Sequence, residues 1–138
     1  MDRFLKFLVV GSIGFLVNAA GLELFRFALT LPGGVFSALS DSLKSSIAAA
    51  GGAELAIISN FLLNDRWTFA NRKGSVKPSR RIKMFLGFNA TSAGAILIQF
   101  FAMWTALHFV PDTTLNRQLI LVCTVILLVV PFNWFMYS

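Results

Sequence analysis

The segment Ser59–Phe69 reads Ser-Asn-Phe-Leu-Leu-Asn-Asp-Arg-Trp-Thr-Phe and follows directly on an apolar, alanine-rich run. Its two amides, Asn60 and Asn64, are four residues apart and so share one face of a helix. After the amides come Arg66, Trp67 and a strongly basic stretch. Amides, aromatic rings and cations in this order are typical of a transmembrane helix that leaves the lipid on the cytoplasmic side. The segment therefore predicts a membrane protein.

The composition of the 138-residue chain supports this prediction. Hydrophobic residues make up 57% and charged residues 13%, whereas a soluble domain is about 25% charged. A soluble chain of this length could not bury so much apolar surface, so much of it must face lipid. The first apolar run spans about 25 residues, which is longer than the apolar region of a signal peptide, so no cleaved signal is expected. The single cysteine, Cys123, excludes an intrachain disulfide.

Four runs are long enough to cross the roughly 30 Å hydrocarbon core, which needs about 20 apolar residues in a helix. They are residues 4–29, 47–63, 84–109 and 118–137. The second run is the least apolar, because it is rich in Ala and Gly and carries Glu54, but an even number of spans depends on it. The sequence thus predicts an all-α integral membrane protein with four transmembrane helices in a single domain, 1–138.

The placement of Lys and Arg predicts the orientation. Nine of the twelve cations precede the first span or lie in the loop between the second and third spans: Arg3, Lys6, Arg66, Arg72, Lys73, Lys77, Arg80, Arg81 and Lys83. The other three are Arg26, Lys44 and Arg117. By the positive-inside rule, both termini and the basic loop are cytoplasmic. A solvated loop beside the membrane, able to bind anionic headgroups or phosphates, is favoured over a nucleic-acid site, and no nucleic acid partner is expected.

Two connecting segments complete the predicted fold. Pro32-Gly33-Gly34 ends the first helix, and apolar residues at helical spacing follow it. Residues 30–46 could therefore hold a short interfacial helix or an outward extension of the second span. The Pro111-Asp112 turn between the last two spans is expected to be short and plain.

The sequence contains an internal repeat, with units at about 3–70 and 81–138. A shift of 78 residues aligns Arg3 with Arg81, and a shift of 73 aligns Asn60-Phe61 with Asn133-Trp134. Each unit has two spans, so both enter the membrane from the same side and form a parallel repeat about an axis along the membrane normal. The second copy stops at Ser138, where the counterpart of Arg-Trp-Thr-Phe would begin, so either the chain is clipped there or the second copy is shorter.

Small or polar residues form a stripe in the first and third spans, each at i, i+3, i+7, i+10 spacing on one helix face. The stripe in the first span is Gly11, Gly14, Asn18 and Gly21; the same offsets in the third span give Asn89, Ser92, the apolar Ile96 and Gln99. Such stripes allow helices to approach closely and to form hydrogen bonds with each other. Packing alone, and packing combined with the lining of a polar path, both remain open.

No enzyme site is predicted. The sequence has no His-Glu-x-x-His, cysteine cluster, Gly-x-Ser-x-Gly, Walker loop or Asp-x-Asp motif, so no catalytic residue, metal ion or cofactor is expected. His108, near the end of the third span, is interpreted as an interfacial anchor. Glu23 and Arg26 are three residues apart on one helix and are expected to form a local ion pair.

Glu54 lies near the middle of the second span, where a charge costs at least about 2.5–3.5 kcal/mol. Its expected partners are Arg26, Lys44 or the amide of Gln99. Two interpretations stay open: a satisfied bond in the bundle interior, or a polar pathway that binds a proton, sugar hydroxyls or a cation.

A shelf of donors near the cytoplasmic headgroups is expected from Asn60, Asn64, Arg66 and Trp67. This shelf could cap and anchor the helix end. Alternatively, it could capture a phosphate or sugar headgroup, because Arg suits bidentate contact with phosphate and Trp offers a face for a sugar ring.

These residues together resemble the GtrA family. The resemblance rests on Arg-Phe-Leu-Lys-Phe-Leu-Val-Val-Gly (3–11) with Gly14 and Asn18, on the block 54–69, on Arg-Arg-Ile-Lys-Met-Phe (80–85) and on Asn133, and so covers essentially the whole chain. The third span departs from the family pattern, with Asn89 and Ser92 where glycines are more usual. The resemblance implies a four-span inner-membrane protein of cell-surface polysaccharide synthesis. Such proteins are thought to flip polyprenyl-phosphate-linked monosaccharides, such as undecaprenyl-phosphate-glucose, and similar domains are fused to polyprenyl-phosphate glycosyltransferases.

The leading hypothesis is translocation of a lipid-linked sugar across the cytoplasmic membrane. The basic loop and the shelf would receive the headgroup, a polar path would carry it past the midplane, and a homodimer or larger assembly could widen that path. The path residues are Asn18, Glu54, Asn89, Ser92 and Gln99, with Asn133 as the second copy of Asn60. Two alternatives are a membrane adaptor that docks a glycosyltransferase through its basic loop, and a small proton-coupled cation transporter that uses Glu54.

Overall fold

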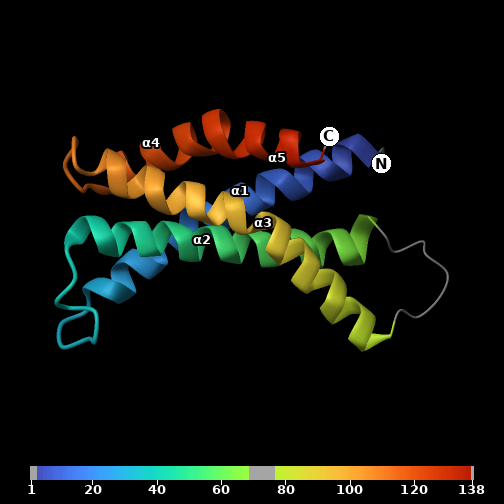
Figure 1. The fold of residues 1–138 in the computed structure, drawn as a ribbon, viewed down its shortest axis with the longest axis horizontal. Helices are drawn as coiled ribbons and strands as arrows, with labels where there is room; N and C mark the ends of the chain where they lie inside the picture. The colour runs from blue at the N-terminus through green and yellow to red at the C-terminus, as the bar shows by residue number, and fades with distance from the viewer. Residues whose placement is uncertain (1–2, 69–76, 138) are drawn as a thin grey trace.

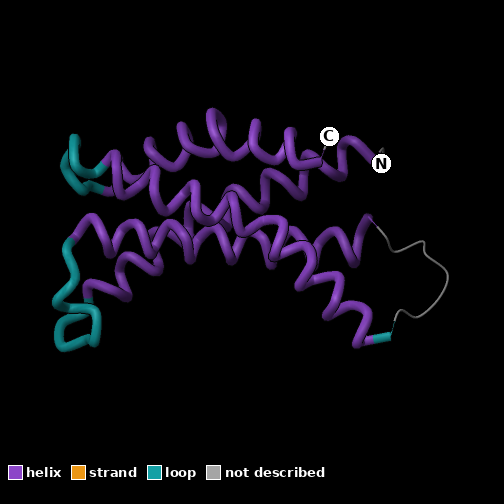
Figure 2. Tube along the Cα trace, viewed as in Figure 1, coloured by secondary structure: helices purple, strands orange, loops and turns teal. Residues whose placement is uncertain are grey.

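The structure is a computed structural model that describes residues 3–68 and 77–137, and every regular element in these residues is helical (Figures 1 and 2). In chain order the elements are α1 (Arg3–Thr30), α2 (Asp41–Leu63), the π-helical turn η1 (Asn64–Thr68), α3 (Pro78–Ala106), α4 (Thr114–Thr124), the π-helical turn η2 (Val125–Val129) and α5 (Val130–Tyr137). Arg72 and Lys73 of the predicted basic loop lie outside the described residues, as does Ser138.

Four continuous helical stretches are long and apolar enough to cross a membrane, which confirms the predicted all-α fold. They are Phe4–Thr30, Asp41–Trp67, Pro78–Ala106 and Thr114–Phe135. The second stretch, which was predicted to be the least apolar, is among them, although the third stretch is slightly less apolar. Most large apolar side chains at the rim of the bundle are exposed, as expected of surfaces that face lipid.

The helix boundaries differ from the predicted spans where polar residues continue a helix. α2 begins at Asp41 rather than 47, α3 at Pro78 rather than 84, and the last span at Thr114 rather than 118, while α3 ends at Ala106 rather than 109. Residues 41–46 are therefore the outward extension of the second span. Residues 31–40 form turns in which Gly33 has a φ of 78°, a conformation that favours glycine.

Each early start carries a recognisable helix signal. The hydroxyl of Ser40 accepts the Leu43 N–H at 3.3 Å, and that of Thr113 accepts the Asn116 N–H at 3.2 Å, so both act as N-caps. Pro78 occupies the first position of α3, where its missing N–H leaves no hydrogen bond unmade.

The π-helical turn η2 is explained by Pro131. A proline in a helix lacks an N–H, and its ring displaces the carbonyl four residues earlier, here that of Leu127. The chain responds with a wider turn, in which the Val130 N–H donates to the Val125 carbonyl five residues back. The helix thus passes the proline without ending.

The bundle has two distinct ends. α1 begins and α5 ends at one end, named here the terminal end, and residues 31–40 and 107–113 form the opposite turn end (Figure 1). α2 packs on both α1 and α3, and α4 contacts α3 and α1. Towards the terminal end, the first half of α3 diverges from α5 (Figure 1).

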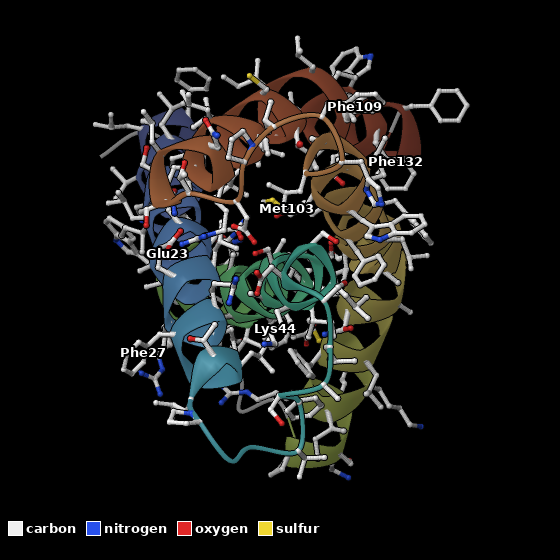
Figure 3. All side chains as sticks on the ribbon, turned by 90° about the vertical axis from the view of Figure 1, so that its left-hand side faces the viewer. Glu23, Phe27, Lys44, Met103, Phe109 and Phe132 are labelled. Atoms are coloured by element: carbon white, nitrogen blue, oxygen red, sulfur yellow. The ribbon has the colours of Figure 1, made fainter. Side chains whose placement is uncertain are left out.

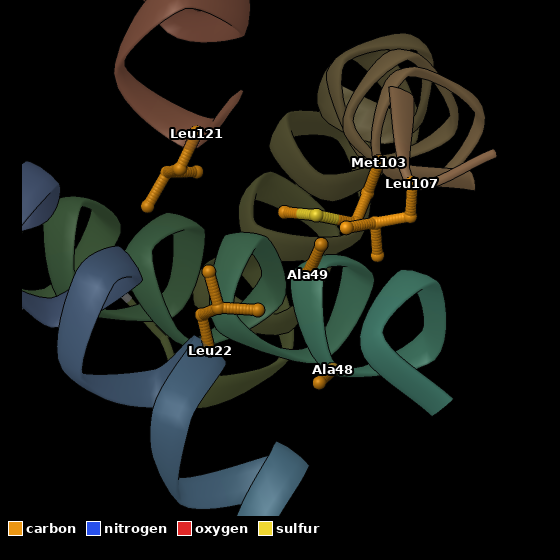
Figure 4. Packing of buried hydrophobic residues seen from close by; sticks show 6 residues of the cluster. All are labelled: Leu22, Ala48, Ala49, Met103, Leu107 and Leu121. Carbon is orange, nitrogen blue, oxygen red and sulfur yellow. The ribbon is translucent and has the colours of Figure 1, made fainter. Parts of the chain in front are cut away.

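The apolar core lies in the half of the bundle nearer the turn end. It is built by small residues of α2 and larger residues of the other helices, shown in Figure 4: Leu22, Ala48, Ala49, Met103, Leu107 and Leu121. Glycines let α1 and α2 approach closely, because a Cβ on Gly21 would lie 2.9 Å from the Gly52 Cα. Gly11 does not share this role, since it is exposed and has nothing within 4 Å of its Cβ position.

Candidate functional site

A line of buried and half-buried polar side chains runs through the bundle, beginning with Asn60 near the terminal end. The Asn60 amide packs directly over Gly14 of α1, where any Cβ would overlap it. Its Oδ1 is buried and accepts no hydrogen bond from any described residue. A buried acceptor without a donor is costly, so this amide is a place where a donor from a ligand or water would be stabilised.

The next polar contact joins Glu54 of α2 to Asn89 of α3. The Asn89 Nδ2 donates to Glu54 Oε1, and both side chains are half-buried. The prediction that Glu54 pairs with Arg26, Lys44 or Gln99 was therefore wrong. Those three side chains lie farther towards the turn end, and the α2–α3 packing places Asn89 nearest to the carboxylate instead.

Asn18 and Gln99 form the third contact, between α1 and α3. The Asn18 Nδ2 donates to Gln99 Oε1 at 2.9 Å, and both residues are buried. Within residues 3–68 and 77–137, the Asn18 Oδ1 accepts no hydrogen bond although it is buried. Ser92, which precedes Gln99 by seven residues on α3, is also buried. The structure thus brings Asn18, Glu54, Asn89, Ser92 and Gln99 into the bundle interior, as two hydrogen-bonded pairs and a serine.

An ionic network closes the turn end. The Arg117 guanidinium donates to Glu23 of α1 at 2.7 Å and to Asp112 at 2.6 Å. Asp112 also accepts from the Ser45 hydroxyl at 2.6 Å and from Arg26 at 3.3 Å. A single carboxylate thereby connects α1, α2 and α4.

Two predictions about this end were wrong. Glu23 and Arg26 do not pair with each other: Glu23 accepts from Arg117 and Gln118, and Arg26 donates to Ser45, Asp41 and Asp112. The turn that contains Asp112 is not plain, because it supplies the centre of the network. Partly buried partners on neighbouring helices replace the local pair, since charges taken out of water need several well-placed hydrogen bonds.

The charge state of Asp112 reflects these contacts. Burial alone would raise the pKa of its carboxyl, but hydrogen bonds from Ser45 and Arg117 and the positive charge of Arg26 outweigh burial and lower the pKa below its ordinary 3.8. Asp112 is therefore ionised at neutral pH and pairs with both guanidinium groups.

The predicted shelf is divided between two surfaces. Asn60 faces α1, whereas Arg66 is exposed and Asn64 and Trp67 are half-buried in η1. The Lys6 ammonium lies 6.0 Å from the centre of the Trp67 ring and donates to the Trp67 carbonyl at 3.5 Å. The π-helical turn that starts at Asn64 alters the helical register between the two amides and the residues after them.

Asn133 has a different setting from Asn60, its predicted counterpart. Asn133 is half-buried on α5, and the ring of Phe132 (labelled in Figure 3) packs over Gly94 of α3 in the way that Asn60 packs over Gly14. The structure therefore does not add Asn133 to the polar line.

The turn-end network was missed by sequence reasoning, although a signal for it existed. Glu23, Arg26 and Arg117 lie inside or at the edge of apolar spans, and ionisable residues there face the bundle interior and pair with one another. Treating the three as one set that required a further carboxylate would have led to Asp112.

Comparison with known proteins gives the family. A family model described as "GtrA/DPMS, transmembrane domain" matches residues 6–138. The chain is also 31% identical over 108 residues to a dolichol-phosphate mannosyltransferase of Pyrococcus furiosus, a match that covers 78% of this chain but only 26% of that protein. No solved structure matches. Since the family match takes in all four spans and the whole polar line, this multi-pass membrane protein belongs to the GtrA/DPMS transmembrane-domain family.

Proposed function

We propose that this protein moves a polyprenyl-phosphate-linked monosaccharide across the cytoplasmic membrane, or is an accessory subunit of that step. The observation that carries the proposal is the pair of buried, unpartnered amide oxygens, Asn18 Oδ1 and Asn60 Oδ1. Inside a membrane such acceptors are destabilising unless a donor reaches them. Sugar hydroxyls are donors of the right kind, and they would meet these oxygens in sequence along the polar line.

The headgroup would enter at the terminal end. Exposed Arg66 and the cations of α3 would attract its phosphate, and Asn60 would take the first sugar hydroxyl. The sugar would then exchange hydrogen bonds with the Glu54–Asn89 and Asn18–Gln99 pairs, which can reform behind it. No bond is made or broken in this scheme, so we propose a carrier and not an enzyme.

The lipid tail would remain outside the bundle. An open apolar groove of about 450 Å³ lies between α3 and the last span and is lined by residues such as Ala102, Ala106, Leu119 and Cys123. An isoprenoid chain fits the chemistry of this groove. A second copy of the protein, packed along the same helices, would widen the route for the sugar.

Transport by purified protein in vesicles tests the proposal. In the Asn60→Leu variant no hydrogen bond is lost, because the Asn60 side chain makes none within residues 3–68 and 77–137. We expect Asn60→Leu to lower the rate of translocation of a fluorescent lipid-linked sugar by at least about tenfold, the effect of one charged or well-placed hydrogen bond, while the melting temperature changes little. Ser12→Ala, on the exposed face of α1, is the matched control. Equal rates for the wild-type protein and Asn60→Leu would contradict the mechanism.

An adaptor role is the second candidate, and one observation favours it. The Pyrococcus furiosus relative is named a mannosyltransferase and is about four times as long as the matched region, which is compatible with a separate glycosyltransferase as the partner of this chain. Exposed Arg80, Arg81 and Lys83 would then form the docking surface. Under this alternative, neutralising the three cations abolishes co-purification of the transferase, and Asn60→Leu has no effect.

A further inference from the structure

Three cations lie within the turn end: Arg26, Lys44 and Arg117 are each less than one-tenth exposed. Glu23 and Asp112 pair with the two guanidinium groups from inside the protein, and Asp41, whose side chain is 73% exposed, pairs with Arg26 from the surface. In the described part of the chain, all these ion pairs involve the two arginines and none involves Lys44.

Two of these cations keep unused donors. Arg26 uses its Nε on Ser45 and its Nη2 on Asp41 and Asp112, but its Nη1 is buried and donates to nothing. The Lys44 ammonium makes no hydrogen bond or ion pair with any residue in the described part of the chain. A buried N–H without an acceptor costs free energy, so Arg26 Nη1 is suited to an anion that the protein itself does not supply. The Lys44 ammonium can add a further donor and a positive charge.

The two cations also lie at the start of a long helix. Lys44 and Ser45 belong to the first turns of α2, which begins at Asp41, and Arg26 contacts this turn through Ser45 at 2.6 Å. Figure 3 looks onto this end and shows Lys44 leaving α2 between α1 and α3. A helix N-terminus adds further partial positive charge and favours anions.

We propose that the turn end holds a binding site for a phosphate group, formed by Arg26 Nη1, Lys44 and the start of α2. A phosphate group offers several acceptor oxygens, which the unused donors of Arg26 and Lys44 could reach. This site is separate from the polar line proposed for the sugar. Only the identity of the molecule that carries the phosphate, a lipid-linked phosphodiester, rests on the proposed function. In that case the site would hold the phosphate at the opposite membrane surface from Arg66.

Lys44→Met is the variant that tests the site. Lys44 has no partner to lose, so this variant should fold with an unchanged or higher melting temperature, whereas substitution of Arg26 would break several contacts. The readout is hydrogen–deuterium exchange of peptides that cover 31–46 in detergent solution. The probes are a short-chain polyprenyl-phosphate sugar, a short-chain phosphatidic acid methyl ester and inorganic phosphate.

We expect the phosphodiesters to slow hydrogen–deuterium exchange of 31–46 in the wild-type protein. In Lys44→Met, the phosphodiester concentration that gives half of this protection should rise at least about tenfold. Protection by inorganic phosphate at equal concentration would also support the site but would identify free phosphate as its ligand. No protection of the wild-type protein, or equal protection of Lys44→Met, would overturn the proposal.

Failure of this proposal can be separated from failure of the proposed function. Arg66→Gln, at the terminal end, should slow transport in vesicles but leave the protection of 31–46 unchanged. If transport is absent while protection persists, the anion site stands and the carrier function falls. If transport persists while protection of 31–46 is absent, the carrier function stands and the anion site falls.

Discussion

Asp112 shows how much a single side chain can hold together at the turn end. It accepts from Arg117, Arg26 and Ser45, so its loss would leave two buried guanidinium groups short of a counter-charge. Removing one partner of a buried ion pair costs about 3–5 kcal/mol in soluble proteins. The stability of the whole bundle should therefore depend on the charge of this carboxyl.

The pH dependence of stability follows from the lowered pKa of Asp112. A carboxyl whose pKa is lower in the folded state contributes stability that is complete above its unfolded pKa, 3.8, and is lost as the pH falls through the folded pKa. We expect the contribution of Asp112 to the melting temperature in detergent to be constant between about pH 5 and 7. The melting temperature should then decrease as the pH is lowered past 3.8.

Asp112→Asn provides the control for this acid effect. The variant should start from a lower melting temperature at neutral pH and show a smaller further loss in acid, since no carboxyl remains to be protonated at this position. Intrinsic tryptophan fluorescence during heating measures both proteins. An identical acid loss in the wild-type protein and in Asp112→Asn would show that another group controls the transition.

The interior residues could be predicted from sequence more easily than their partners. Asn18 and Gln99 recur at helical spacing with other small or polar residues, and this period alone predicts that they face inward. Pairing is different, because Glu23 and Arg117 are 94 residues apart in the chain. Their contact depends on how the helices are rotated and packed, and local sequence patterns carry no information about that.

At the scale of elements, α1 and α2 pack with their backbones in contact. A Cβ on Gly52 would lie 2.7 Å from the Asn18 carbonyl oxygen and 2.8 Å from the Leu22 nitrogen. Both neighbours are backbone atoms, which cannot turn aside as a side chain can. The two helices would have to move apart, and the Asn18 amide would move with α1.

Gly52→Ala should therefore destabilise the protein by about 1–3 kcal/mol, the usual cost of overpacking. Gly87→Ala on α3 is the matched control, because nothing lies within 4 Å of its Cβ position, and alanine stabilises a helix relative to glycine by up to about 1 kcal/mol. Thermal unfolding of the two variants in the same detergent measures the difference. The packing analysis would be wrong if Gly87→Ala lost as much stability as Gly52→Ala.

The elements themselves were predictable, but their ends were not. Hydropathy finds all four spans and excludes polar flanks such as Asp41–Ser46 and Pro78–Lys83, which the structure adds to α2 and α3. Helices include such residues because backbone hydrogen bonds and start signals, here the Ser40 cap and Pro78 at the first position of α3, decide where they begin. The π-helical turn before Pro131 could not be predicted either, because hydropathy patterns assume a constant number of residues per helical turn.

At the scale of the whole molecule, the exposed cations gather at one end. The three Lys and Arg residues of the turn end are buried, and residues 31–40 and 107–113 contain no Lys or Arg. The unequal distribution of Lys and Arg between the two ends, which predicts cytoplasmic termini, is thus larger among exposed residues than in the sequence as a whole.

Cysteine accessibility tests this orientation. In a Cys123→Ala background, a cysteine at Val35, which is 93% exposed at the turn end, should react with a membrane-impermeant maleimide in intact cells. A cysteine at exposed Ser79, near the terminal end, should react only after the membrane is opened. The opposite pattern would place the termini outside and reverse the predicted topology.

The long separations within the turn-end network also bear on how the protein is made. Glu23 is synthesised 94 residues before Arg117, and Arg26 is synthesised 86 residues before Asp112. At about 5–20 residues per second, the ribosome needs roughly 5 to 20 s to supply the missing partners. Until then Glu23 lacks the cation that it pairs with in the folded protein, whereas Arg26 can already pair with Asp41 of the second helix. The network at the turn end is therefore complete only when the last span emerges.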